Sequence, residues 1–218
     1  TLPDTKKLVR FKDERGWRWY SHPEDTKNPE KWYTSVTAVI GIVVADRLKD
    51  YLSSVDSGVQ KARLEKAVAS GNSIHEAIQS DLMGKPWNAA DPSLVAPMRL
   101  WDQLRHEHRI SADYCEVSVY APTWGYAGTI DSLGRYDDKM TILDIKTGFF
   151  STKAGWQMGA YWAALKELTG QNAGLVGLSI KADGSKANTF EYTHTEDWCL
   201  PTFLASLQAW KGLYYSRL

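Results

Sequence analysis

The stretch Trp124–Gly148, WGYAGTIDSLGRYDDKMTILDIKTG, decides the fold of this chain. It predicts two β-strands, at about 126–136 and about 140–147. Between them Asp137-Asp138-Lys139 is typical of a tight turn, because aspartate readily adopts turn conformations. We therefore expect a β-hairpin here.

The charged residues of this hairpin are expected to meet at one place. Side chains alternate between the two faces of a strand, so Asp144 and Lys146 should point the same way and Ile145 into the core. The hairpin would bring Asp131, in an otherwise apolar run of the first strand, beside Asp144. Two carboxylates and one ammonium at one spot are costly unless something compensates them, and a divalent metal ion would do so.

The composition is that of an ordinary globular protein of 218 residues, so a single domain, 1–218, is expected. The chain has 26 basic and 26 acidic residues and no net charge. This excludes a general basic coat for wrapping duplex nucleic acid, so any contact with nucleic acid must use a local patch.

The two cysteines, Cys115 and Cys199, lie far apart and form no CxxC motif. They cannot build a zinc or iron–sulfur site alone, and they favour a reducing compartment. No apolar run is long enough to span a membrane. We expect a cytoplasmic protein, in the host cell if the source is viral; because the chain starts at Thr1, this expectation leaves open a removed targeting segment.

The order of predicted elements gives an α/β (α+β) fold, with a central mixed sheet flanked by helices and an N-terminal helical region. An arm with a small hairpin occupies 1–34, a mainly helical region 35–110, and alternating strands and helices 111–218. The apolar segment 34–44 is compatible with a strand or with a short helix that begins at Ser35.

A long helix is predicted over 58–83, with a second one at 93–108. The first should have one apolar face, made by Leu64, Ala67, Val68, Gly71, Ile74, His75, Ile78 and Leu82. Gly71 is expected to weaken or split this helix. A histidine placed like His75 is, taken alone, more often a hydrogen-bonded core residue than a metal ligand.

Several familiar sites are absent from the sequence. There is no GxGxxG after a strand, no GxxxxGK[ST], no HExxH and no GxSxG. The remaining constellation is Glu116, Asp131, Asp144 and Lys146.

Five short motifs in a fixed order carry a resemblance to a known superfamily. They are GNSIH (71–75), the acid Glu116, GTID (128–131), DIKTG (144–148) and QMGAY (157–161). In this order they resemble the PD-(D/E)XK nucleases, in particular the branch of RecB-type, Cas4-type and mitochondrial genome maintenance exonucleases. The resemblance extends from about 35 to about 193 and implies a restriction-endonuclease-like core within 111–218. Cas4-type relatives carry four cysteines for an iron–sulfur cluster, so none is expected in a chain with two.

The resemblance implies a Mg²⁺ site at which Mn²⁺ can substitute, and hard oxygen ligands suit this choice. The expected ligands are His75, Asp131, Asp144 and the main-chain carbonyl of Ile145. Glu116 would hold a water of the metal or a second metal ion.

The remaining implied roles concern the attacking water and the phosphate. Lys146 would orient or deprotonate the water, or clamp the phosphate, and its pKa should fall on burial although the carboxylates oppose this. Gln157 and Tyr161 would hold the scissile phosphate or orient Lys146. Lys153 adds local positive charge, and Lys181 is a further candidate for phosphate contact, although exposed turn lysines usually have no such role.

The expected function is that of a DNA exonuclease acting on single strands or free ends, with possible recombination or replication partner proteins. Aromatic residues near the site offer stacking for unpaired bases, worth about 1–3 kcal/mol per base: Trp124, Tyr126, Phe149, Phe150 and Trp156. Two alternatives remain open at this point. One is a structure- or sequence-specific endonuclease on the same fold, and the other is an inactive nucleic-acid-binding module.

Overall fold

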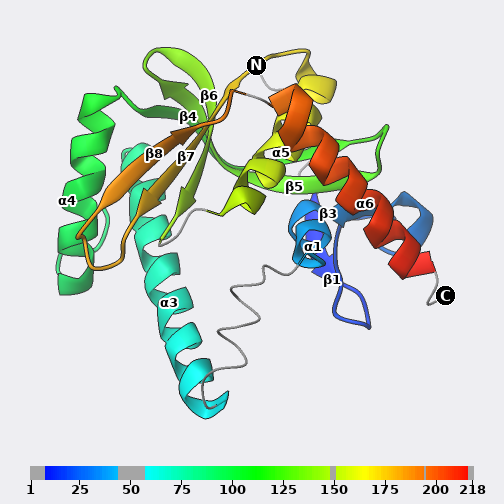
Figure 1. Ribbon diagram of the computed structural model, residues 1–218, viewed down its shortest axis with the longest axis horizontal. Helices are drawn as coiled ribbons and strands as arrows, with labels where there is room; N and C mark the ends of the chain where they lie inside the picture. The colour runs from blue at the N-terminus through cyan, green and yellow to red at the C-terminus, as the bar shows by residue number, and fades with distance from the viewer. Residues whose placement is uncertain (1–7, 44–56, 148–150, 194, 216–218) are drawn as a thin grey trace.

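The computed structural model describes residues 8–43, 57–147, 151–193 and 195–215, without the side chains of 57–64, 66 and 215. It has an α/β architecture in which helices cover both faces of one mixed, eight-stranded sheet (Figure 1). The predicted fold class is confirmed at this level. None of the described helices combines the length and the apolarity needed to cross a membrane.

The strands follow the order β1-β2-β3-β5-β6-β7-β8, and β4 pairs with β5 beside this path. The pairs β3·β5 and β6·β7 are parallel, and all other pairs are antiparallel. The strands are β1 Val9–Lys12, β2 Arg18–Ser21, β3 Tyr33–Ser35, β4 Ser111–Ala121, β5 Tyr126–Tyr136, β6 Lys139–Lys146, β7 Gly174–Ile180 and β8 Ala187–Glu191.

The α-helices are α1 Val36–Gly41, α3 Ser57–Leu82, α4 Pro92–Glu107, α5 Thr152–Thr169 and α6 Leu200–Tyr215. The ambiguous segment 34–44 contains both expected structures, since β3 ends at Ser35 and α1 begins at the next residue; residue 44 lies outside the described residues. Helix α5 is followed by Gly170, whose left-handed backbone (φ 69°) ends the helix, a conformation that glycine adopts without strain.

The β5–β6 hairpin forms as predicted. Its two central turn residues, Asp137 and Asp138, both have positive φ angles, 48° and 64°. Two consecutive left-handed residues are what a tight two-residue hairpin turn requires, and aspartate tolerates this conformation better than most residues. The flanking residues Tyr136 and Lys139 pair directly, so β6 begins one residue earlier than predicted.

The two faces of the sheet carry separate cores. Helices α1, α5 and α6 pack on one face, around Val39, Met158 and Phe203, each fully buried. Helices α3 and α4 pack on the other, where Ile74 and Trp101 are almost fully buried against β6 and β7. Figure 1 shows these two groups of helices on opposite sides of the sheet.

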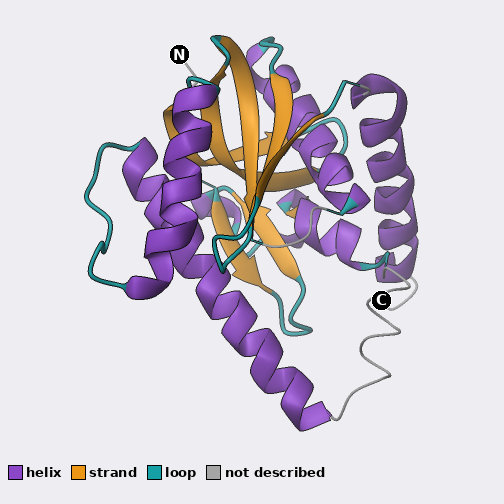
Figure 2. Cartoon of the chain, turned by 60° about the vertical axis from the view of Figure 1, so that its left-hand side comes forward, coloured by secondary structure: helices purple, strands orange, loops and turns teal. Residues whose placement is uncertain are grey.

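Helix α3 corrects two expectations. It runs unbroken through Gly71 for 26 residues, so this glycine neither ends nor splits it. Only its second half is packed as predicted, because Ile74, Ile78 and Leu82 are buried whereas Ala67 and Val68 are exposed. The first turns of the helix project beyond the sheet (Figures 1 and 2). The side chain of Leu64 lies outside the described residues.

Candidate metal centre

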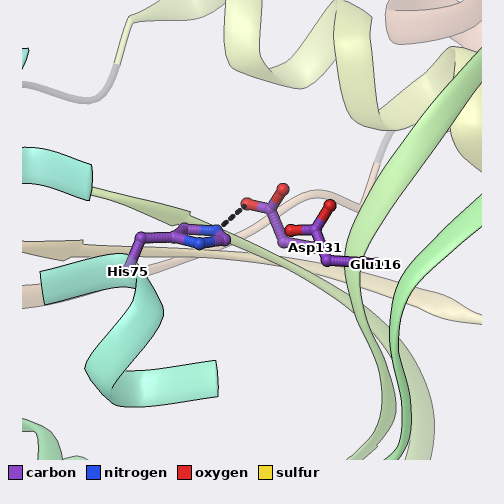
Figure 3. A group of neighbouring side chains, drawn as sticks. All are labelled: His75, Glu116 and Asp131. Atoms are coloured by element: carbon purple, nitrogen blue, oxygen red, sulfur yellow. Dashed lines mark ion pairs between the residues drawn. The ribbon is translucent and has the colours of Figure 1, made fainter. Parts of the chain in front are cut away.

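Three potential metal ligands from three different elements meet at the middle of the sheet. In the β4–β5 pair, Cys115 lies opposite Ser132 and Val117 opposite Ile130, which places Glu116 opposite Asp131. Helix α3 adds His75. One ligand atom from each of His75, Glu116 and Asp131 lies within 4.8 Å of the other two (Figure 3).

Asp131 is the residue that joins these elements. Its Oδ2 lies 3.2 Å from Nε2 of His75, and it accepts a hydrogen bond of 3.0 Å from the backbone N–H of Ile145. The N–H and C=O of one residue point to the same side of an extended strand, so the carbonyl of Ile145 also faces β5. Its predicted role as a main-chain ligand is compatible with this orientation.

Asp144 lies beside this group and is almost completely buried, with 1% of its surface exposed. Its Oδ1 accepts hydrogen bonds from Nζ of Lys146 at 2.7 Å and from Nε2 of Gln157 at 3.3 Å. Its Oδ2 is buried and has no hydrogen-bond partner among the described residues. The predicted shared face of Asp144 and Lys146 is confirmed, as is the burial of Ile145 (4% exposed).

Helix α5 holds Asp144 of β6 in place by a hydrogen bond. Gln157 donates one hydrogen bond to Asp144 and another, of 2.9 Å, to the hydroxyl of Tyr161. Tyr161 is 3% exposed, and its ring lies directly against Gly128 of β5, where a Cβ would overlap the ring. The glycine of the GTID motif is therefore required by this close approach.

A second motif glycine has a similar role on the other side of the site. A Cβ at Gly71 of α3 would lie 2.6 Å from Oγ1 of Thr147, which follows β6. A side chain at this position would require the hydroxyl of Thr147 to move, so the glycine favours the close approach of α3 to the end of β6. The glycine of GNSIH and the threonine of DIKTG thus take part in one packing contact.

The two buried aspartates have opposite pKa shifts. Burial raises the pKa of Asp144 to about 6, against the attraction of Lys146. Burial also disfavours ionisation of Asp131, but its hydrogen bond to His75 and the charge of Lys146 outweigh it and lower the pKa of Asp131. Asp131 therefore ionises first as the pH rises, and Asp144 is the carboxylate whose charge is less well compensated.

The neighbouring groups respond to these carboxylates. The hydrogen bond to Asp131 raises the pKa of His75, and burial raises the pKa of Glu116 with help from the charge of Asp131. Burial lowers the pKa of Lys146, but the charges of Asp144 and Asp131 outweigh it, so the net shift is upward. The expected fall in the pKa of Lys146 is wrong for the metal-free site, because two carboxylates act on one ammonium.

Glu116 has an unusual backbone. Its φ angle is 53°, in the left-handed region that non-glycine residues rarely occupy. Such strain persists only where the surroundings enforce it, and it occurs often at functional sites. Sequence alone gave no signal of this conformation.

A cleft of about 360 Å³ opens at this site. The exposed side of α3 forms one wall, and the end of β6 with Lys146 and Thr147 forms another. The residues that line it are Ala67, Val68, Gly71, Asn72, His75, Ile145, Lys146 and Thr147. The surface of α3 that was expected to be core is thus a wall of this cleft.

Two predicted lysines are not brought to the centre. Lys153 is half-buried in the first turn of α5, and Lys181 is exposed after β7. Neither makes a hydrogen bond or ion pair with the described residues of the acidic cluster. Their proposed contact with phosphate remains a prediction.

One of the five aromatic residues expected to stack on bases is ruled out for that role. Tyr126 is fully buried and donates its hydroxyl to the carbonyl of Ala160, so its predicted stacking role is wrong. Trp124 is 38% exposed, and Trp156 is half-buried against the core. Phe149 and Phe150 lie outside the described residues.

The donor set fits a hard divalent cation. Carboxylates, one imidazole and one backbone carbonyl are ligands that Mg²⁺ or Mn²⁺ accepts, and the partnerless Oδ2 of Asp144 is a buried acceptor that a cation would satisfy. The residues Asp131, Asp144, Glu116 and His75, with the carbonyl of Ile145, would hold it.

No family model matches this chain, and no curated protein matches it either.

Proposed function

We propose that this protein is a metal-dependent nuclease of the PD-(D/E)XK type that hydrolyses DNA, acting as an exonuclease on single strands or free ends. One observation carries the proposal: motif residues that are distant in sequence converge at one place. His75, Glu116, Asp131, Asp144 and Gln157 come from α3, β4, β5, β6 and α5 in turn. Chance occurrences of such short motifs have no reason to meet.

The topology around the site supports the same proposal. The β5–β6 hairpin is followed by the crossover helix α5 and by β7, which lies parallel to β6. This is the arrangement that a restriction-endonuclease-like core would have around its central acidic strand. The acids lie in the middle of β4 and β5 and near the end of β6, next to the cleft.

A bound cation would neutralise charge on the attacked phosphate and make water more acidic. Lys146 acts as a cation in our proposal, because the net upward shift of its pKa keeps it protonated. With 35% of its side chain exposed at the cleft, it clamps the phosphate or orients water rather than removing a proton.

Gln157 has a positioning role in this proposal. It shares Oδ1 of Asp144 with Lys146, and it is held in turn by Tyr161. The amide thus fixes the carboxylate to which the lysine is bonded. The orienting role expected for these two residues is favoured over direct phosphate contact, because both are buried (8% and 3% exposed).

Single strands or ends are the favoured substrate for two reasons. The chain carries no net charge, which disfavours broad binding to duplex. The cleft of about 360 Å³ lies between a helix and a strand end rather than on an open basic surface.

The test compares the wild type with Asp131→Asn on end-labelled single- and double-stranded DNA, in Mg²⁺, Mn²⁺ or EDTA. Asp113→Asn, an exposed acid on β4, is the matched control. We expect shortening by the wild type and by the control only, and none in EDTA. Binding without cleavage under all conditions would instead indicate an inactive module, and discrete bands from a plasmid would indicate a site-specific endonuclease.

A further inference from the structure

The N-terminal hairpin has one strongly basic face. Strands β1 and β2 pair with Arg10 opposite Tyr20 and Lys12 opposite Arg18. Opposite residues, and residues two apart, share one face of an antiparallel pair. Arg10, Lys12 and Arg18 therefore lie on the same face, whereas Trp19 lies on the other and packs in the core.

These three cations have no acidic partner among the described residues. Arg18 donates a hydrogen bond of 2.9 Å to the neutral hydroxyl of Thr37, and Arg10 and Lys12 are exposed. The acid of the adjoining turn, Asp13, is bonded to the ring N–H of Trp19 and to its own loop instead. Like charges directly opposite each other in a sheet are unfavourable, so a bound anion would relieve the repulsion between Lys12 and Arg18.

A cavity of about 450 Å³ lies at the end of the hairpin next to Lys12 and Arg18, on the side where Trp19 packs against Trp210. Lys12 and Arg18 line it together with the indoles of Trp17 and Trp210, whose ring centroids lie 5.0 Å apart. None of the described residues that line it is acidic. Cationic groups beside an aromatic wall are the two features with which proteins hold phosphates and unpaired bases.

The basic face and the acidic centre lie near each other. The hydroxyl of Tyr20 is hydrogen-bonded to Oγ1 of Thr129 at 3.1 Å. Thr129 lies two residues before Asp131 on β5. The charge of Arg10 also acts on the carboxylate of Glu116.

We propose that the basic face of the β1–β2 hairpin, with the cavity beside it, binds a single-stranded segment of the DNA substrate. Phosphates lie on Arg10, Lys12 and Arg18, and one base enters the cavity against Trp17. The inference rests on the proposed nuclease function, which supplies the nearby reaction centre. An unpaired base can turn toward the aromatic wall of this cavity, whereas a base held in a duplex stays stacked between its neighbours.

The experiment measures binding of a fluorescent oligothymidylate to the full chain in EDTA, where no cleavage interferes. The test variant is Arg10→Gln/Lys12→Gln/Arg18→Gln. The matched control removes the same charge from exposed lysines elsewhere, as Lys27→Gln/Lys139→Gln/Lys186→Gln. We expect the test variant to bind about 10- to 100-fold more weakly, and its slope of log affinity against log salt to fall by about 2, since three phosphate contacts are lost. The control should bind like the wild type.

A second arm tests the cavity. An abasic site moved stepwise along the oligonucleotide should weaken binding by about tenfold at one position for the wild type, because one base loses its aromatic partner. The test variant should lose this position dependence.

Equal binding by test variant and wild type would overturn the inference even if Asp131→Asn establishes the nuclease. If binding depended on the hairpin but no DNA were cleaved, the binding inference would be supported and the proposed nuclease function would be wrong. Lys12→Glu, a single change at an exposed position, covers the case in which the triple variant does not fold, and it too must weaken binding.

Discussion

The acidic centre and the basic hairpin lie on one sheet but treat charge in opposite ways. At the centre, Asp144 is 1% exposed and its pKa is raised to about 6, so its ionisation opposes folding. On the hairpin, Arg10 and Lys12 stand in solvent and cost the fold little. A buried charge costs free energy, so its presence suggests a functional role. Exposed charges of one sign cost little, and where they cluster they favour a partner of opposite charge. In our proposals the acidic centre carries the chemistry and the basic hairpin binds the substrate.

The largest effect should come from Lys146→Ala. Cleavage should fall by about 100- to 10,000-fold, because the cation that faces the phosphate is lost. The metal-free protein should also lose about 3 kcal/mol of unfolding free energy at pH 8, since Asp144 is left as an unpaired buried charge. This loss should shrink at pH 5, where Asp144 is protonated.

Cleavage assays and urea unfolding at the two pH values measure these effects, with Lys139→Ala on the exposed start of β6 as the control. If cleavage were unchanged, Lys146 would not be the lysine that acts on the phosphate. The division of roles between the acidic centre and the basic hairpin would then be wrong.

The next effect is a gain of stability from Asp144→Asn. The pKa of this carboxyl is about 6 in the folded protein against 3.8 unfolded, so its ionisation weakens the fold as the pH rises through this range. Above pH 7 the variant should be more stable than the wild type by about 1–3 kcal/mol, the lower value allowing for the lost ion pair with Lys146. The gain should disappear as the pH falls to about 4.

Asp131→Asn should do the reverse. The pKa of Asp131 is lowered in the folded protein, so its carboxylate stabilises the fold above the unfolded pKa, and this contribution is lost as the pH falls. Urea unfolding of both variants in EDTA across pH 4–8 distinguishes them. Destabilisation by both at pH 8 would contradict the assignment of Asp144 as the strained member of the pair.

A smaller effect is expected from Gly128→Ala. The new methyl group would overlap the ring of Tyr161, which is buried and cannot move aside. Overpacking of this kind costs about 1–3 kcal/mol, and the shift of Gln157 should lower cleavage without changing DNA binding by the hairpin. Gly212→Ala on α6, with nothing within 4 Å of the added carbon, is the control and should be neutral or slightly stabilising. Thermal unfolding, cleavage and binding assays on both variants check this.

The smallest effect concerns metal affinity and pH. The hydrogen bond to Asp131 raises the pKa of His75, and its Nε2 must lose a proton before it binds a cation. Mn²⁺ affinity should therefore fall on acidification by up to about tenfold per pH unit from this group. Titration calorimetry of the wild type and His75→Asn measures the difference in slope. Hairpin variants should keep the wild-type slope; a change in them would show that the two regions are coupled.

Much of the centre could be predicted from the sequence. The DIKTG motif gave the shared face of Asp144 and Lys146, and the aspartate-rich turn gave the hairpin that places Asp131 near them. These features are local, because alternation along a strand and turn chemistry depend on neighbours in the chain. The exposure of Ala67 and Val68 was missed, since an apolar helix face has the same pattern whether it meets a core or a cleft.

The sequence by itself therefore determined the elements of this protein and the types of residue at its acidic centre. Only the tertiary structure decided which carboxylate is strained, that Glu116 has a left-handed backbone, and that Arg10, Lys12 and Arg18 share a face. The physical reason is that desolvation and strand register depend on residues far apart in the chain. The identity of a charged residue does not reveal whether its side chain will be buried or exposed. Its pKa and role depend on the surroundings that the fold provides.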